Sequence, residues 1–328
     1  MNELALAAFA ASNDMHADDR EARSRRFAGF EASFDADGYV RALAERRLRW
    51  LARSDGAFPE RLRAIHDPPP GLFLRGRADG ELLSRPAVAM VGARSCTDYG
   101  AHVARELARG LAAAGVVVVS GLARGIDGWA HRGALDSGGD TVAVLGCGID
   151  RDYPRAHAQL AAQIAATGVI VSEYPPGVAP APWRFPARNR IVAGLTLGTL
   201  VVEARERSGA LITADLALEE GREIFAVPGE ITSGLSHGTN ALLRTGAVPV
   251  TCAEDVLEAI GIERPVKPEP EPPPPGAPRT VLAAIDGGAQ TADEITRATG
   301  LAADEVAAGL VELELSALVS VSAGVYRR

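Results

Sequence analysis

The sequence predicts an α/β fold: a doubly wound, mainly parallel sheet, with a small N-terminal helical region and a small C-terminal domain. Short β-branched runs without polar alternation, such as Val88–Val91 and Val116–Val119, are typical of parallel strands covered on both faces. Between residues 87 and 262 such runs alternate with segments of helical periodicity, which indicates βαβ units. A proline-rich break near residue 270 then separates the last fifty residues from the sheet.

Residues 1–85 are expected to form the N-terminal helical region and a connector to the sheet. The stretch RALAERRLRWLA at residues 41–52 predicts an amphipathic helix, with Leu43, Leu48, Trp50 and Leu51 as its apolar positions. Leu72–Leu74 predicts a short strand ahead of the main domain.

Residues 86–262 are expected to form the sheet domain, with about seven strands. Its first unit is strand Val88–Val91, a helix in which Val103, Leu107 and Leu111 recur every fourth residue, and strand Val116–Val119. Further strands are predicted at Thr141–Leu145, Val169–Ser172, Thr199–Val202, Glu223–Val227 and Val248–Thr251, and helices at Arg155–Ala166 and Leu211–Glu220.

Residues 263–278 are rich in proline and acidic side chains and predict a semi-rigid, extended linker. In residues 279–328, helices are predicted at 281–285, 291–299 and 303–315, followed by a hairpin-like wing at 319–326. Three helices and a wing indicate a winged helix. Its many acidic and few basic residues favour protein contact over strong DNA binding.

Composition limits the function classes. A net charge of −8 argues against a protein that coats nucleic acid through a generally basic surface. Lys267 is the only lysine, however, so nearly every positive charge is a guanidinium, which binds phosphate with two hydrogen bonds and stacks on bases. Three dispersed cysteines indicate a reduced, cytoplasmic protein without disulfides or structural zinc. No membrane span or secretory signal is expected.

Two glycine turns follow the first two parallel strands, Gly92-Ala93-Arg94 and Ser120 to Gly125 with Gly121 and Arg124. Ligands bind at the carboxyl ends of the strands in open parallel sheets. Glycine allows close approach of the backbone, free N–H groups at a helix start favour anions, and arginine binds phosphate oxygens. The two turns therefore predict a ligand that carries phosphate.

Further candidates lie after later strands. Arg155 follows Tyr153-Pro154, as part of the same site or as a solvated surface arginine. Asp127 follows the second glycine turn, where it can hydrogen-bond the loop backbone, cap the next helix or contact a ligand. The segment Arg188-Asn189-Arg190 can hold a phosphate beside a nearby aromatic, and Ser208-Gly209 opens a helix suited to an anion.

Several common chemistries lack their motifs. The sequence has no G-x-G-x-x-G after the first strand, no G-K-[ST] and no H-E-x-x-H, so no cofactor or metal is expected. Gly234 to Gly238 matches G-x-S-x-G formally. A nucleophile elbow needs a strand that runs directly into the serine, and Pro228-Gly229 intervenes, so we interpret this segment as a loop.

The motifs as a series resemble the DNA-processing protein A (DprA, also called Smf) family over about residues 60–262. They are Gly92-Ala93-Arg94, Tyr99-Gly100, Ser120 to Asp127, Tyr153-Pro154, Ser172 to Pro175, Phe185 to Ile191, Val202 to Ala204, Ser208 to Ala210, Val227 to Gly229 and Gly238 to Asn240. The resemblance implies an extended Rossmann-like domain that binds single-stranded DNA (ssDNA), forms a homodimer and helps to load the RecA recombinase in natural transformation.

The resemblance also implies site residues. In this family the Gly-Ser/Ala-Arg turn and the basic residue after Tyr-Pro line the DNA pocket, here Arg94 and Arg155. The candidate nucleic-acid-binding residues are Gly92, Ala93, Arg94, Ser120, Gly121, Arg124, Arg155, Arg188, Asn189, Arg190, Ser208 and Gly209. The candidate dimer contacts are Asn240, Leu242, Leu243 and Val248.

Two further expectations concern departures from the family. Many members begin with a sterile-alpha-motif-like (SAM-like) helical domain, and no G-x-G turn occurs here before Gly71, so residues 1–85 predict a shortened or divergent copy. The alternative function is an enzyme that acts on a nucleotide, similar to phosphoribohydrolases of related fold. Those enzymes carry P-G-G-x-G-T-x-x-E, whereas this chain has Pro228-Gly229-Glu230, so no enzyme activity is expected.

Overall fold

The computed structural model describes residues 2–9, 20–262, 276–316, 318–322 and 324–327. The chain divides into two compact units, Met1–Arg264 and Pro265–Arg328. Most of the predicted linker, residues 263–278, lies outside the described residues. In the described part of the chain, no helix combines the length and hydrophobicity that crossing a membrane requires.

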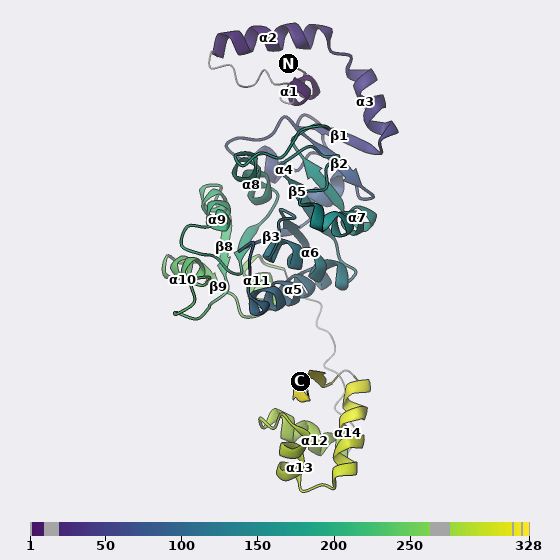
Figure 1. The fold of residues 1–328 in the computed structure, drawn as a ribbon, viewed down its shortest axis with the longest axis vertical. Coiled ribbons are helices and arrows are strands. Elements are labelled where there is room, and N and C mark those ends of the chain that lie inside the picture. Colours follow the sequence, from purple (N-terminus) through teal and green to yellow (C-terminus); the bar gives the residue numbers. More distant parts are fainter. Residues whose placement is uncertain (1, 10–19, 263–275, 317, 323, 328) are drawn as a thin grey trace. The chain divides into compact units, whose positions relative to one another are not determined.

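In the first unit, nine strands among the described residues form one sheet in the order β1-β2-β6-β5-β4-β3-β7-β8-β9 (Figure 1). They are β1 (Leu48–Ala52), β2 (Gly71–Gly76), β3 (Ala87–Val91), β4 (Val117–Ser120), β5 (Thr141–Leu145), β6 (Val169–Ser172), β7 (Gly198–Val201), β8 (Glu223–Ala226) and β9 (Val248–Pro249). Pairing is antiparallel at β1·β2 and β2·β6 and parallel elsewhere. The chain adds β4, β5 and β6 on one side of β3 and then β7, β8 and β9 on the other. The order therefore reverses between β3 and β7, the kind of switch point where α/β sheets bind ligands.

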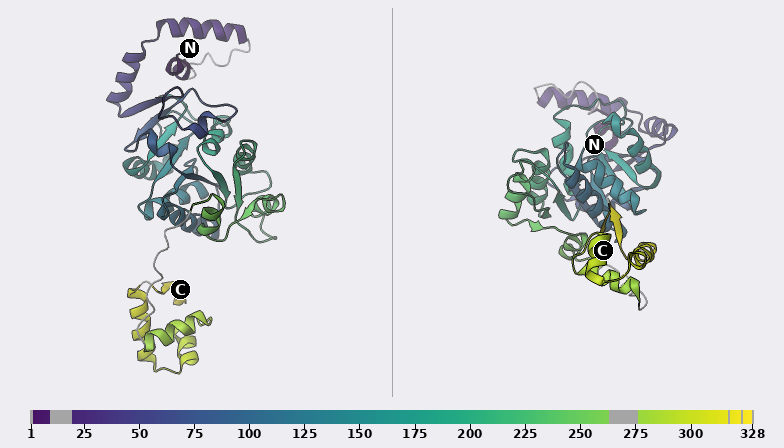
Figure 2. Two further views of the ribbon diagram at one scale, coloured as in Figure 1. Left: turned by 180° about the vertical axis from the view of Figure 1, so that it is seen from behind. Right: turned by 60° about the horizontal axis from the view of Figure 1, so that its bottom comes forward.

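Helices cover both faces of this sheet (Figures 1 and 2). Those of the first unit are α1 (Glu3–Phe9), α2 (Arg20–Ser33), α3 (Ala36–Glu45), α4 (Glu60–Arg63), α5 (Asp98–Ala113), α6 (Ile126–Asp136), α7 (Ala158–Thr167), α8 (Arg184–Gly194), α9 (Gly209–Glu219), α10 (His237–Arg244) and α11 (Ala253–Ala259), with 3₁₀ turns η2 (Gly80–Ser84) and η3 (Arg155–His157). Val88 and Met90 of β3 pack in one core with α5, α6 and α11. Ala87 and Ala89 face the opposite core, which contains α8 and α9. Alternate residues of one strand thus serve two helix layers, as the unbroken apolar runs predict.

The predicted helix at residues 41–52 is wrong in its second half. Helix α3 ends at Glu45, Arg47 has a φ of +57°, and β1 begins at Leu48. The cause is long-range, because β1 pairs along its length with β2 and the Trp50 ring packs against Phe73 with centroids 4.6 Å apart. The sheet consequently begins at β1 rather than near the predicted boundary at residue 86, and it holds nine strands instead of about seven.

The strands predicted in the parallel part all occur, within two residues of their predicted ends. Thr251 lies outside β9 because its backbone N–H and hydroxyl donate to Asp255 Oδ2 at 2.7 and 3.0 Å, at the start of α11. The helix predicted from Arg155 begins as the 3₁₀ turn η3 before α7.

The second unit contains the three predicted helices and the wing. They are α12 (Ala277–Asp286), α13 (Ala292–Thr299), α14 (Ala303–Leu315) and the antiparallel pair β10 (Ser320–Ser322) and β11 (Val325–Arg327). The Thr291 hydroxyl accepts from the Glu294 N–H, and the Glu294 carboxylate accepts from the Thr291 N–H, so the unit has the capping box expected from the sequence. Val281, Ile295 and Leu313 are buried in a core of its own.

His131 of α6 is fully buried, and only one of its two ring nitrogens has a hydrogen-bond partner among the described residues. Its Nδ1 is 2.7 Å from the Thr141 hydroxyl, and that hydroxyl donates its proton to the Val118 carbonyl at 2.7 Å. Nδ1 must therefore be the donor, which leaves Nε2 as a buried acceptor without a partner among the described residues. Burial lowers the pKa of His131 to about 3.

We expect acid to destabilise the first unit through His131. The unfolded imidazole titrates near its ordinary pKa of 6.5 and the folded one near 3, so between these values the unfolded state binds the extra proton and stability falls as the pH falls. From pH 6 to pH 4 the loss is roughly 2–3 kcal/mol. Urea unfolding of His131→Asn should show a flatter pH dependence than the wild type, whereas His102→Gln, an exposed control, should not. Equal slopes for the wild type and His131→Asn would contradict this account.

Candidate nucleic-acid interface

Two adjoining hollows open at the carboxyl edge of the parallel strands. The smaller, here called the switch hollow, has a volume of about 270 Å³ and lies between the ends of β3 and β7, with Gly92, Ser208 and Gly209 in its wall. The larger, the arginine hollow, has a volume of about 670 Å³. Its lining residues are Arg94, Ser95, Gly121, Ala123, Arg124, Leu145, Gly146, Cys147, Tyr153, Pro154, Arg155, Phe185 and Arg188. Arg94, Gly121, Ala123, Phe185 and Arg188 line both hollows.

The two glycine turns pack directly on one another, and glycine makes this possible. Gly125 has a φ of +73°, and a Cβ there would collide with the Ala93 carbonyl oxygen. The Ile126 N–H donates to that same oxygen at 3.2 Å. This contact holds the loops that carry Arg94 and Arg124 side by side.

Arg188 supplies a fixed charge in the floor of both hollows. It is 5 % exposed, and its Nη1 donates to the Gly121 carbonyl at 2.9 Å and to the Val144 carbonyl. A Cβ at Gly121 would occupy the space of its guanidinium. Burial lowers the pKa of Arg188, and the nearby Asp127 opposes that change.

Asp127 binds the loop backbone and also lines the switch hollow. Its Oδ2 accepts from the N–H groups of Gly121 and Ala123 at 3.1 and 3.2 Å. Burial raises the pKa of this carboxyl, and Arg188 and the two N–H groups act in the opposite direction. The expectation that amides of the second turn are free for an anion is therefore wrong for Gly121 and Ala123.

A second carboxylate occupies the start of α5. Glu203 is buried and accepts from the Thr97 N–H at 2.9 Å and from the Thr97 hydroxyl at 2.5 Å. In nucleotide-binding sheets, the helix start after the first strand is where phosphate binds. Here the Glu203 carboxylate occupies the position at the start of α5 where a phosphate would bind. The positive charge at the carboxyl edge of the sheet therefore comes from guanidinium groups.

Arg94, Arg124 and Arg155 are exposed and line the same hollow, which places Arg155 beside Arg94 and not on an unrelated surface. His157 connects their loops, because its Nδ1 donates to the Leu122 carbonyl at 3.0 Å and so joins η3 to the second glycine turn.

An aromatic pair completes the wall. Tyr153 stacks on Phe185 with centroids 5.3 Å apart and planes at 23°, and the Arg94 guanidinium lies 5.5 Å from the Phe185 centroid. Neither Tyr153 nor Phe185 is among the candidate site residues, although an aromatic was expected near Arg188. The signal that could have identified them is an aromatic next to arginine in two loops at the same edge of the sheet.

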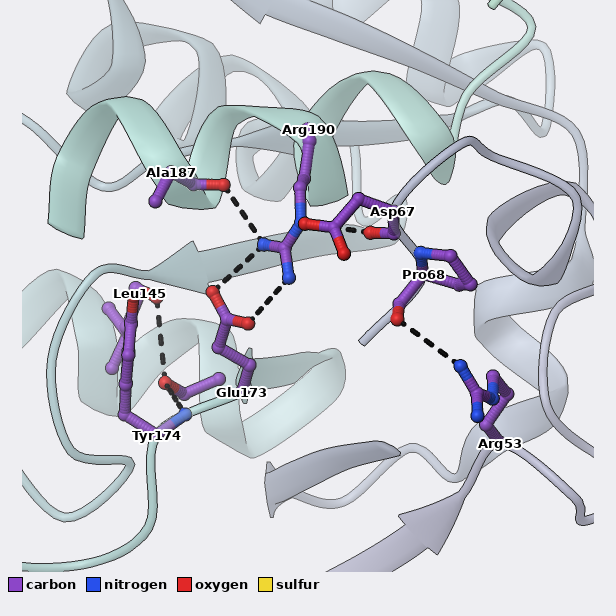
Figure 3. Close-up of polar contacts among 9 residues, drawn as sticks. Arg53, Asp67, Pro68, Leu145, Glu173, Tyr174, Ala187 and Arg190 are labelled. Atoms are coloured by element: carbon purple, nitrogen blue, oxygen red, sulfur yellow. Dashed lines mark hydrogen bonds and ion pairs between the residues drawn. The ribbon is translucent and has the colours of Figure 1, made fainter. Parts of the chain in front are cut away.

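Arg190 lies apart from the hollows. Its Nη1 and Nη2 donate to Glu173 Oε1 and Oε2 at 2.9 and 2.7 Å, and its Nε donates to Asp67 Oδ2 at 2.9 Å (Figure 3). Burial lowers the pKa of Arg190, but the hydrogen bonds and charge of Glu173 outweigh this effect and raise it overall. Arg190 therefore joins α8 to the loop after β6 and to the α4–β2 connection.

The structure brings most of the other candidates together. Nine line one hollow or both: Gly92, Arg94, Gly121, Arg124, Arg155, Arg188, Asn189, Ser208 and Gly209. Ala93, Ser120 and Arg190 line neither. Ser120 is buried and its hydroxyl donates to the Met90 carbonyl at 2.6 Å. Ser208 also caps α9, since its hydroxyl accepts from the Ala210 N–H at 3.2 Å.

The candidate dimer contacts lie on α10 and β9 and partly serve the fold itself. The Asn240 amide donates to the Gly229 carbonyl at 3.0 Å and accepts from its N–H at 3.2 Å. Leu242 and Val248 pack partly against the two cores, and Leu243 is also half-buried. Ser236 of the G-x-S-x-G match is buried at the start of α10, and no strand runs into it, as the loop interpretation requires.

Residues 49–261 match the family model described as DNA recombination-mediator protein A, and residues 265–324 match the DprA winged helix domain. The DNA processing protein DprA of Streptococcus pneumoniae is 48 % identical over 203 residues, which cover 62 % of this chain and 71 % of that protein. Protein Smf of Escherichia coli is 40 % identical over 308 residues, covering 88 % and 82 %.

Two solved structures are similar. The X-ray structure of DprA from Streptococcus pneumoniae has a TM-score of 0.65 at 40 % identity and covers 74 % of this chain and 83 % of its own. DNA processing protein A from Helicobacter pylori, solved to show its ssDNA binding mode, has a TM-score of 0.59 at 32 % identity and covers 65 % and 95 %. These matches confirm the predicted α/β fold and winged helix. Since the family match spans more than half of the sequence, this chain belongs to the DNA recombination-mediator protein A (DprA/Smf) family.

Proposed function

We propose that this chain binds ssDNA along the carboxyl edge of its sheet and delivers it to the RecA recombinase. The observation that carries the proposal is the arginine hollow, where the guanidinium groups of Arg94, Arg124, Arg155 and Arg188 converge beside the Tyr153–Phe185 pair. Guanidinium groups bind phosphate with charged hydrogen bonds, and aromatic faces stack on bases. Both features together fit an unpaired strand, because a duplex hides the faces of its bases.

The rest of the molecule is consistent with a local site on an acidic protein. The net charge of −8 leaves the attraction for phosphate to this cluster, so affinity should fall with salt in proportion to a small number of phosphates. The related Helicobacter pylori protein is described by its ssDNA binding mode, which supports the same ligand class for this chain.

We further propose a homodimer formed through the surface of α10 and β9, with Leu242, Leu243 and Val248 among its contacts. A dimer would have two arginine hollows. One DNA strand bound in both would have a higher apparent affinity for the protein than a strand bound in a single hollow. A strand held in this way leaves segments accessible to RecA.

A binding role is favoured over the nucleotide-processing alternative. Asp127 and Glu203, the buried carboxylates nearest the two glycine turns, are both occupied by protein N–H groups. Burial raises the pKa of the Cys147 thiol to about 11, so this side chain of the hollow is protonated at neutral pH and is a weak nucleophile.

The test is binding of a fluorescent oligo(dT) and of a matched duplex at two salt concentrations, with light scattering to count subunits. We expect tighter binding to the single strand, a dimer, and faster assembly of RecA on ssDNA in the presence of this protein. Nucleoside monophosphates should release no base. A preference for duplex would overturn the assignment of the ligand, and unchanged RecA assembly would overturn the delivery step.

A further inference from the structure

Exposed aromatic side chains of the described residues gather at one edge of the sheet. They are Tyr99, Tyr153 and Trp183, exposed by 57, 41 and 51 % respectively. Each belongs to the segment that follows a parallel strand, β3, β5 and β6 in turn. Large aromatic side chains are usually buried. Exposed ones at the carboxyl edge, which also carries the arginine hollow, are suited to stacking on a ligand with flat faces.

Trp183 stands outside the arginine hollow and is held firmly. The Arg184 guanidinium lies 4.8 Å from the Trp183 centroid and 5.1 Å from that of Tyr174, and Tyr174 meets Trp183 edge to face at 6.5 Å. Tyr174 is buried, and Arg184 Nη1 donates to the Ala179 carbonyl. The indole is thus supported from inside while half of its surface faces solvent.

Trp183 lies next to the arginine hollow, on the side of β6. Phe185, which lines the hollow, is two residues from Trp183, so their backbones are at most about 7 Å apart. Trp183 is near Tyr174, just after β6, and β6 is the neighbour of β5 in the sheet. A strand that leaves the hollow over β5 in that direction reaches the indole next.

We propose that Trp183 forms an outer nucleotide subsite, where the first base beyond the arginine hollow stacks on the solvent-exposed part of the indole. This inference rests on the proposed ssDNA binding and extends it from a pocket to a track. The subsite tolerates any base, because every base presents a π face and the site offers stacking rather than base-edge hydrogen bonds. It also predicts that the footprint on DNA extends past the nucleotides held by the arginines.

The experiment compares Trp183→Ala and Trp183→Phe in the full chain, using oligo(dT) of increasing length. Loss of one stacked base should weaken binding of long oligonucleotides by about 5- to 150-fold, and phenylalanine should restore most of the affinity. Oligonucleotides too short to leave the hollow should bind both variants like the wild type. In a Trp50→Phe/Trp129→Phe background, long oligo(dT) should quench Trp183 fluorescence.

Arg94→Ala, measured in parallel, separates the two claims. If Arg94→Ala weakens binding and Trp183→Ala leaves long oligonucleotides unaffected and unquenched, the outer subsite is wrong and the ssDNA site stands. If Arg94→Ala has no effect, the proposed site itself is wrong. An equal loss at every oligonucleotide length would also overturn the subsite, since Trp183 would then act through the hollow.

Discussion

Replacing Arg94 with alanine is expected to weaken ssDNA binding by about 10- to 150-fold. The reason is the charged hydrogen bond to phosphate that this guanidinium can make, worth roughly 1.5–3 kcal/mol. Arg94 is exposed, lines both hollows and contacts Phe185, so no other described arginine combines these features. Loss of one phosphate contact should also reduce the slope of log K against log salt by about 0.7 for a single strand.

The matched control is Arg109→Ala. Arg109 is exposed on the distal part of α5 and is paired with Glu106, so the substitution removes the same formal charge away from the hollows. Anisotropy titrations with oligo(dT) at several salt concentrations should give wild-type affinity and slope for Arg109→Ala. If both variants lose affinity equally, attraction arises from overall charge, and the localised site is incorrect.

Arg190→Ala is expected to have the largest effect on stability, lowering the free energy of unfolding by about 3–5 kcal/mol. The substitution leaves Glu173, whose side chain is 13 % exposed, without its two-point partner. Chemical denaturation measures this change. Arg190→Ala/Glu173→Gln should recover part of the loss, because the buried charge is then removed as well.

The same variant discriminates between two roles for Arg190. Under conditions where Arg190→Ala remains folded, its affinity for oligo(dT) should match the wild type within about twofold, since Arg190 lines neither hollow. A stable Arg190→Ala protein with a tenfold loss of affinity would instead return this residue to the DNA site.

Much of the sheet could be predicted because its parallel strands are local signals. Buried runs such as Ala87–Val91 have no polar face and can hardly be anything else at that length. β1 carries no such signal, since Leu48 and Leu51 fit a helix as well as a strand. Only pairing with β2, which begins about twenty residues further along the chain, decides between helix and strand.

The site was predictable where position in the chain determines position in space. A turn directly after a parallel strand must lie at the carboxyl edge, which places Arg94 and Arg124 together. Arg188 and Arg190 share one helix, but two residues correspond to about 200° of rotation, so they point in nearly opposite directions. Sequence reasoning cannot tell which one faces the hollow until the packing of α8 is known.

The carboxylates that fill the backbone donors were the least predictable feature. Glu203 lies 106 residues from the Thr97 it binds, and no spacing rule connects them. Asp127 is close in sequence to Gly121, yet a cap and a ligand contact look alike until the burial of the side chain is known.

Amide hydrogen exchange with and without oligo(dT) tests the central claim most directly. We predict slower exchange on DNA binding at the carboxyl-edge loops, residues 92–96, 121–125, 146–155 and 183–189, and no change at the opposite edge, residues 114–116, 137–140 and 220–222. Protection confined to the opposite edge, or to the winged helix at residues 277–327, would contradict the account.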